Sequence, residues 1–207
     1  MMTISFVKDY VKHRLTAKNR HRLHCTFVFK LVDEVIYDDT PQSVYTEIES
    51  NKRGILPNSR RTGNRPKADQ LLYRLARHFN PRQIVEIGTG MGISKLYLTR
   101  ALPNAHLSSL EHDGSLKHWM GKLKAIDFAF INYYDPAELL TAFELMLPKF
   151  NADSVLVICN VYGNPLAKQS FQVIKMHPKV TATVDLFWLQ LVFFKDGVEK
   201  EHFRLRF

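Results

Sequence analysis

The sequence predicts an α/β protein built on a mostly parallel β-sheet. Residues 83–102 give the first indication, because an apolar run, a glycine-rich turn and a helical segment follow one another directly. Short apolar runs then alternate with helical segments as far as residue 176, which is the order of strands and crossover helices in a parallel sheet. Segments rich in β-branched and aromatic residues close the chain, and we expect them to form antiparallel strands that complete the sheet.

Composition places the chain among ordinary soluble globular proteins. Of its 207 residues, 45% are apolar and 24% are charged, which allows one full core and an appendage. No apolar run approaches the length of a membrane span, and the N-terminus lacks the apolar centre of a signal peptide. We therefore expect a cytoplasmic protein with no membrane partner. Cys25 and Cys159 lie far apart without metal-ligand spacing, so we expect two reduced thiols.

Basic charge is concentrated near the N-terminus. Residues 1–80 hold 15 Lys and Arg against 8 Asp and Glu, a net charge of +7, whereas residues 81–207 hold 14 against 12, a net charge of +2. The excess of positive charge in residues 1–80 predicts either a surface that binds an anionic partner, such as RNA or a membrane surface, or a basic face exposed to solvent. Few aromatic residues interleave with the charges of residues 53–67, so a stacking platform for RNA bases is not expected.

Helical periodicity describes most of the first 80 residues. Residues 4–16 predict an amphipathic helix with a basic outer face. The apolar residues at helical spacing in it are Ile4, Val7, Val11 and Leu15. Further helices are predicted over residues 23–37, 42–52 and 69–79, and the Gly-, Pro- and Arg-rich residues 53–68 predict a mobile basic loop.

The glycine-rich turn is the most informative stretch. The apolar run at residues 84–87 ends in residues 88–92, Gly-Thr-Gly-Met-Gly, and a helix is predicted from Ile93. Glycines let the backbone turn tightly and approach a ligand, and the helix start offers unpaired N–H groups. The spacing G-x-G-x-G differs from the G-x-G-x-x-G that seats a pyrophosphate. Glu86 would repel a dinucleotide phosphate but suits a ligand with an ammonium group, which points to S-adenosylmethionine (SAM).

The alternation of strands and helices continues after this turn. Helices are predicted over residues 93–102, 115–125, 137–147 and 166–176. Strands are predicted over residues 105–110, 128–131, 154–158, 180–186, 189–195 and 202–207. Asp196-Gly197 is a turn signal between the last two strands.

These residues give the chain a resemblance to class I SAM-dependent methyltransferases, and within them to a bacterial group of the catechol-O-methyltransferase type. The resemblance covers residues 24–29 (HCTFVF), 81–98 (PRQIVEIGTGMGISKLYL) and 185–207 (DLFWLQLVFFKDGVEKEHFRLRF). It implies a Rossmann-like domain at residues 69–207 behind an N-terminal helical extension and basic loop at residues 1–68. It also implies SAM as cofactor and a small-molecule methyl acceptor.

The resemblance also implies a set of cofactor-binding residues. An acidic residue at the tip of the second strand accepts both ribose hydroxyls in this family, and Glu111 occupies that position here. The expected cofactor-binding residues are Glu86, Gly88, Thr89, Gly90, Gly92, Glu111, His112 and Asn132.

Two departures from the family pattern bear on structure and mechanism. Only residues 112–127 separate the second strand from the next, so the family's third strand is expected to be absent, which leaves a bare sheet edge suited to a homodimer. Metal-dependent members carry acidic ligands where this chain has Asn132 and Cys159-Asn160. Two amides and a thiol make a poor Mg²⁺ site, so no metal is expected, although Asp135 is an alternative ligand. The catalytic base is not identified; the residues weighed are His112, Tyr133, Tyr162 and Lys168.

Three functions follow from these features. The first is a metal-independent SAM-dependent methyltransferase that acts on a small hydroxylated or amine acceptor, since SAM already carries an activated methyl group. The second is a degenerate methyltransferase fold that serves as a binding or dimeric structural module. The third is an RNA-directed methyltransferase that uses the basic N-terminal residues. Nucleic acid is not the expected partner in the first two.

Overall fold

A computed structural model describes residues 3–18, 25–55, 66–88, 90, 92–110, 116–132, 135–197 and 199–207, without the side chains of residues 52–55. Its helices are α1 (Ile4–Thr16), α2 (Thr26–Leu31), α3 (Ser43–Ile55), α4 (Pro66–Phe79), α5 (Ile93–Ala101), α6 (Leu116–Lys122), α7 (Leu139–Met146) and α8 (Pro165–Met176). Its strands are β1 (Gln83–Ile87), β2 (His106–Leu110), β3 (Phe128–Ile131), β4 (Val155–Cys159), β5 (Ala182–Asp185), β6 (Leu189–Phe193) and β7 (Glu201–Arg204). A π-helical turn, η2 (Val32–Ile36), continues α2, and two 3₁₀ turns are η3 (Leu147–Lys149) and η4 (Val161–Gly163).

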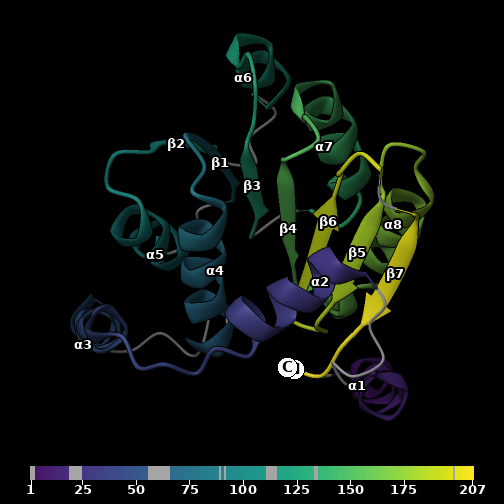
Figure 1. Ribbon diagram of the computed structural model, residues 1–207, viewed down its shortest axis with the longest axis horizontal. Helices are drawn as coiled ribbons and strands as arrows, with labels where there is room; N and C mark the ends of the chain where they lie inside the picture. The colour runs from purple at the N-terminus through teal and green to yellow at the C-terminus, as the bar shows by residue number, and fades with distance from the viewer. Residues whose placement is uncertain are drawn as a thin grey trace.

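One seven-stranded sheet organises the described residues (Figure 1). Its strand order is β2-β1-β3-β4-β6-β5-β7, and β6 alone runs antiparallel to its neighbours. The predicted α/β fold with a mostly parallel sheet is confirmed. Within the described part of the chain no strand lies beyond β2, which forms one edge of the sheet, and α6 alone occupies the described part of the short link to β3.

Helices cover both faces of the sheet, which explains why the central strands are almost continuously apolar. On one face, α2, η2, α4 and α5 pack on side chains such as Ile84, Phe128 and Phe130. On the other face, α6, α7 and α8 pack on the alternate side chains, such as Val85 and Ile131. Every residue of β3 and β4 is buried. Strands that bury both faces read as unbroken apolar runs, as the sequence did.

The chain changes direction across the sheet between β1 and β3. From β1 it moves outward to β2, then returns to the other side of β1 to form β3 (Figure 1). The connections that leave the carboxyl ends of β1 and β3 therefore diverge. In open α/β sheets a crevice forms at such a switch point, outside the carboxyl ends of the strands.

Local sequence explains where α8 begins. The Asn164 side chain accepts a hydrogen bond of 2.8 Å from the Leu166 amide, and Pro165 occupies the first helical position of α8.

The loop predicted over residues 53–68 is shorter than expected at both ends, so these predicted bounds are wrong: α3 continues to Ile55 and α4 begins at Pro66. The rest of that loop lies outside the described residues.

The first predicted helix forms, but it presents the opposite face to the protein. Ile4, Val7, Val11 and Leu15 are exposed, and the buried side of α1 carries Phe6, Tyr10 and His13 instead. We expected the apolar stripe to face the core, and this expectation is wrong. The reason is aromatic packing: Phe6 and Tyr10 contact the ring of Phe187, whose distance in sequence hides it from any periodicity argument.

No helix among the described residues is both long and apolar enough to span a membrane. The division of the chain at residue 68 stays a prediction. Side chains of α2 and η2 nevertheless share one apolar core with α4 and the sheet.

Candidate cofactor site

Glu86 is the centre of a buried hydrogen-bond chain at the switch point. Its side chain in β1 is fully buried. One carboxylate oxygen accepts a hydrogen bond of 2.5 Å from the Ser94 hydroxyl, and the other accepts one of 3.1 Å from the Ser109 hydroxyl. The Asn132 amide in turn donates to the Ser94 hydroxyl over 3.0 Å. These hydrogen bonds therefore link β1, β2, the first turn of α5 and the end of β3.

Strand register explains why these side chains meet. Glu86 is paired with Ser109 across the β1–β2 ladder, and residues opposite one another in a sheet point to the same face. Ser94 is the second residue of α5, which begins directly after the glycine turn, so its hydroxyl lies over the end of β1. A buried carboxylate is tolerated only where donors replace its water, and the two serines supply them.

The glycine turn above this chain has a backbone that other residues adopt with difficulty. Gly88, Gly90 and Gly92 have φ angles of 74°, 54° and 74°. A methyl group added at Gly90 or Gly92 would meet no heavy atom within 4 Å, so this part of the turn borders open space. The Gly88 amide donates to the Leu110 carbonyl over 2.7 Å, which ties the turn to the end of β2.

The helix that follows the turn begins without a side-chain cap. Gly92 is the capping residue of α5, and it has no side chain to accept from the N–H groups of the first turn. A helix start of this kind favours anionic groups through its N–H donors and its dipole. A backbone that borders open space, a helix start and a buried carboxyl group thus lie within one corner.

The structure brings together some of the predicted site residues. Glu86, Gly88, Gly90, Gly92 and Asn132 all belong to this corner, whereas Thr89, Glu111 and His112 lie outside the described residues. The structure contains no ligand, so the cofactor role of each residue stays a prediction. The residues do fit the amino-acid part of SAM: the helix start suits its carboxylate, and the Glu86 charge suits its ammonium group.

Sequence reasoning missed Ser94 and Ser109. A signal for Ser94 was present, because a polar residue two positions after the last glycine must fall in the first turn of the helix. Ser109 offered less, since a serine in an edge strand is ordinary. Its role follows only from the β1–β2 register, which places it opposite Glu86.

The two described candidates for a catalytic base are held by structural contacts. The Tyr162 hydroxyl donates to Asp185 over 2.5 Å, and burial together with the Asp185 charge raises the pKa of Tyr162 above its usual range. The Lys168 ammonium pairs with Asp9 of α1 at 2.6 Å. His112 and Tyr133 lie outside the described residues. Neither Tyr162 nor Lys168 is a free base in this structure.

Further residues lie at the carboxyl ends of the central strands, next to the corner that contains Glu86. Asn160 directly follows β4 with a φ angle of 56°, and Cys159 before it is buried, which raises the pKa of its thiol. Beyond them, a cavity of about 190 Å³ lies between α1, η4, α8 and β7. Its polar lining includes Asp9, Lys12, His13, Tyr162, Lys168 and Arg204.

Within the described part of the chain, no group of three or more His, Cys, Asp or Glu is arranged to hold a metal ion. Asn132 and Asn160, which follow β3 and β4, carry neutral amides, and neutral amides are weak ligands for Mg²⁺. Asp135 instead accepts a hydrogen bond of 2.9 Å from the Ala137 amide, in the turn before α7.

Comparison with known proteins finds similarity in structure alone. No family model matches this chain, and no curated protein matches it in sequence. Among solved structures, a methyltransferase from Podospora anserina with bound S-adenosylhomocysteine (SAH) is 13% identical, with a TM-score of 0.60, over 84% of this chain and 98% of the other. The O-methyltransferase TomG from Streptomyces achromogenes, which is involved in tomaymycin synthesis and was crystallised with SAM, is 17% identical, with a TM-score of 0.58, over 79% of this chain and 95% of the other.

A third structure, an O-methyltransferase from Bacillus cereus in complex with SAH, is 19% identical with a TM-score of 0.58. It matches over 81% of this chain and 97% of its own. At such low identity the likeness concerns the course of the backbone. The chain therefore has the fold of these methyltransferases, as its sequence predicted.

Proposed function

We propose that this protein is a SAM-dependent methyltransferase that acts on a small hydroxylated or amine acceptor without a metal ion. The observation that carries the proposal is the buried chain Asn132–Ser94–Glu86–Ser109 beneath an open glycine turn at the switch point of the sheet. The shared fold of SAM- and SAH-bound methyltransferases supports it. We also propose a cytoplasmic location.

The chain's own residues would bind and orient the cofactor. The turn at Gly88–Gly92 and the start of α5 would receive its amino-acid part, and the negative charge of Glu86 would favour its cationic groups. Glu111 would hold the ribose hydroxyls, with Thr89, His112 and Asn132 beside the cofactor, as the family resemblance implies. SAM supplies a methyl group already bonded to a positive sulfur.

The acceptor would lie along the carboxyl edge of β3 and β4. Asn132 and Asn160 end these strands and offer neutral amide donors and acceptors in place of metal-binding carboxylates. Methyl transfer from a sulfonium to a hydroxyl or amine gives the methylated acceptor, SAH and one proton. The amides would align the nucleophile with the methyl group, and the proton would pass to water. Metal independence is part of the proposal.

Calorimetric titration with SAM and SAH tests cofactor binding. Glu86→Gln keeps the size of the side chain and leaves partners for both serine hydroxyls, because a hydroxyl both donates and accepts. We expect the variant to weaken binding of either ligand by about tenfold, with a loss of unfolding free energy of about 1 kcal/mol or less. Glu144→Gln on the exposed face of α7 is the matched control and should bind like the wild type.

Absence of binding by the wild-type protein at high micromolar SAM and SAH would refute the proposal. Binding without turnover of any hydroxylated or amine acceptor would favour the second function, a degenerate fold that serves as a module. Among the described residues β2 is an edge strand, and this favours a homodimer for that module, because an open strand edge can pair with a second copy. Sedimentation equilibrium measures the dimer directly.

A further inference from the structure

Helix α1 has two apolar faces, and only one of them is covered by the described residues. On the covered face, the ring centroids of Phe6 and Tyr10 lie 5.2 and 5.0 Å from that of Phe187. His13, on the same side, is 2% exposed and lies 3.2 Å from the Asp185 carbonyl oxygen. This face attaches α1 to the connection between β5 and β6.

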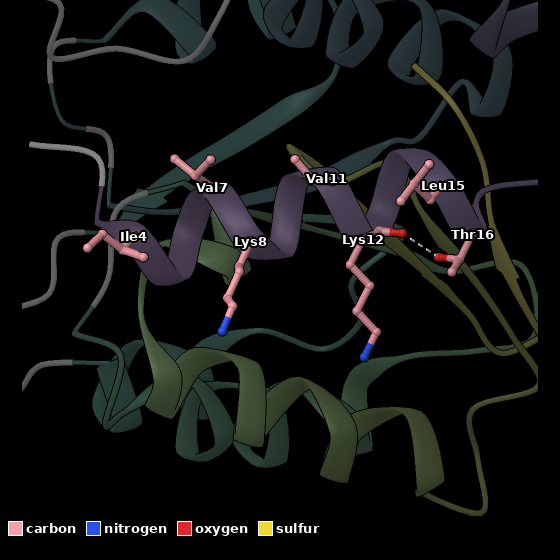
Figure 2. A pocket seen from close by; sticks show the side chains of 7 residues that line it. All are labelled: Ile4, Val7, Lys8, Val11, Lys12, Leu15 and Thr16. Carbon is pink, nitrogen blue, oxygen red and sulfur yellow. Dashed lines mark hydrogen bonds between the residues drawn. The ribbon is translucent and has the colours of Figure 1, made fainter.

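The opposite face carries a stripe of large apolar side chains in contact with solvent (Figure 2). Their exposed fractions are 86% for Ile4, 49% for Val7, 50% for Val11 and 78% for Leu15. Scattered exposed apolar residues are common, but these four follow one another along the whole length of one helix. A continuous stripe of this kind marks a surface that meets an apolar environment.

Basic residues border this stripe. Lys8 and Lys12 flank the stripe on one side and, in Figure 2, extend away from Val7, Val11 and Leu15. Helical spacing places Arg14 on the other flank of the stripe. All three are exposed. Asp9, the one acidic residue of α1, pairs instead with Lys168 of α8. The exposed surface of α1 therefore combines apolar side chains with positive charge.

The helix is held in place by its covered face, so its exposed face is preformed. Thr3 caps its start, the Lys168–Asp9 ion pair measures 2.6 Å, and the Arg204 guanidinium donates to the Thr16 hydroxyl over 2.8 Å. Beyond its end, the Lys18 amide donates to the Arg204 carbonyl over 2.8 Å. Binding through the exposed face would not need to pay for ordering the helix.

We propose that the outer face of α1, formed by Ile4, Val7, Val11 and Leu15 with Lys8, Lys12 and Arg14, binds the anionic lipid surface of a membrane. An apolar stripe bordered by basic residues is the pattern of a helix that lies in the membrane interface. This departs from the sequence expectation of no membrane partner, and it requires no spanning helix.

Charge and area favour a bilayer over a second copy of the chain. Two copies would bring Lys8, Lys12 and Arg14 against the same basic residues, in a protein with a formal net charge of +9. A face of 13 helical residues is only about 20 Å long and by itself falls short of the roughly 1,200 Å² that stable interfaces bury. A basic helix face with an apolar stripe instead suits an anionic lipid surface, where each basic residue adds attraction.

The position of α1 connects this contact with the candidate cofactor site. The helix packs on Phe187 and Trp188, which follow the carboxyl end of β5, and it contacts η4, which follows the carboxyl end of β4. The cofactor corner lies on the same edge of the sheet, at the ends of β1 and β3. Lipid contact through α1 would bring this edge toward the membrane.

Vesicle flotation tests the proposal independently of activity. We expect the full chain to float with vesicles of phosphatidylcholine and phosphatidylglycerol, and not with phosphatidylcholine alone. Ile4→Ser with Leu15→Ser should weaken binding to the mixed vesicles at least about tenfold, because it removes apolar side chains near the helix ends. Lys8→Gln with Lys12→Gln should also weaken it at least about tenfold, since each basic residue contributes about fivefold.

Matched controls separate this surface from general exposure and charge. Met176→Ser removes a 70% exposed apolar residue of α8, and Lys117→Gln with Lys124→Gln removes two exposed charges elsewhere; both should bind vesicles like the wild type. Thermal unfolding by circular dichroism should show the wild-type transition for every variant. Failure of the wild type to float, or equal flotation of the Ile4/Leu15 variant, would overturn the proposal. So would a dimer in sedimentation that this variant abolishes, because the face would then be a subunit interface.

Discussion

Asp185 lies where α1, η4 and β7 meet, and its replacement by Asn should destabilise the fold measurably. Its side chain is 9% exposed and is surrounded by donors. The Tyr162 hydroxyl lies 2.5 Å from the carboxylate, the Phe187 amide 3.0 Å, and the Arg204 guanidinium 3.4 Å. A carboxylate only accepts hydrogen bonds, whereas an Asn side chain would direct an NH₂ group toward some of these donors.

The shift in the pKa of Asp185 gives the size of the expected loss of unfolding free energy. Burial by itself raises the pKa of Asp185, but hydrogen bonds from His13 and Tyr162, the His13 charge and the Phe187 amide together lower it from 3.8 to about 2. A difference of nearly two pKa units corresponds to about 2.5 kcal/mol of unfolding free energy at pH 7. For a chain of this size, we expect Asp185→Asn to lower the melting temperature by about 5–10 °C.

The sign of the pH dependence gives a second test. Because the folded-state pKa is the lower one, the stabilisation is complete above the unfolded-state value of 3.8 and disappears as the pH falls toward 2. The difference between wild type and Asp185→Asn should therefore be nearly full at pH 5 and fall to about half at pH 3. Urea unfolding followed by tryptophan fluorescence measures both values.

Asp153→Asn is the matched control, because the Asp153 side chain is 90% exposed and pairs with Lys195 only at 3.6 Å. It should change the unfolding free energy by about 0.5 kcal/mol or less. A loss for Asp185→Asn no larger than this, or a difference that persists unchanged at pH 3, would refute the reasoning.

Three further predictions concern the cofactor corner and the thiols. Gly92→Ala should lose about 1–2 kcal/mol of unfolding free energy because its φ is 74°, whereas Gly121→Ala in α6 should be neutral or stabilising; urea unfolding that shows equal losses would contradict this. Ser94→Ala should cost about 1–3 kcal/mol in the same assay, because a buried carboxylate loses a donor, and the exposed Ser5→Ala should cost almost nothing. A maleimide should label Cys25 well before Cys159, which is buried and has a raised thiol pKa; equal rates by peptide mass spectrometry would contradict the buried position.

The sequence was sufficient for the strands of the sheet and for the corner of the site, but not for the ends of α3 and α4. The periodicity of apolar residues located the first six strands of the sheet to within about two residues, and the last to within three, because buried strands impose their own spacing. The glycine spacing and Glu86 likewise pointed to one corner, since a strand, a tight turn and a helix start are consecutive in the chain. These are local properties, and local residues carry them.

The sequence did not predict which distant segments contact one another. The turn signal Asp196-Gly197 suggests that β6 and β7 pair directly, yet β7 pairs in parallel with β5, because both sides of β6 are occupied by β4 and β5. The hydrogen bonds of Glu86 depend on Ser109, whose position opposite it follows from the register of two strands separated by a helix.

Helix α1 shows the division most clearly. Its spacing established that the segment is a helix, but either apolar face could have been buried. Contacts with Phe187 and Asp185 determine which face of α1 is buried. These two residues lie more than 170 residues away in sequence and contact Phe6, Tyr10 and His13. Hydrophobic periodicity shows that a helix face is apolar. The shape and charge of the surface on which the helix packs determine which face is buried and which stays exposed.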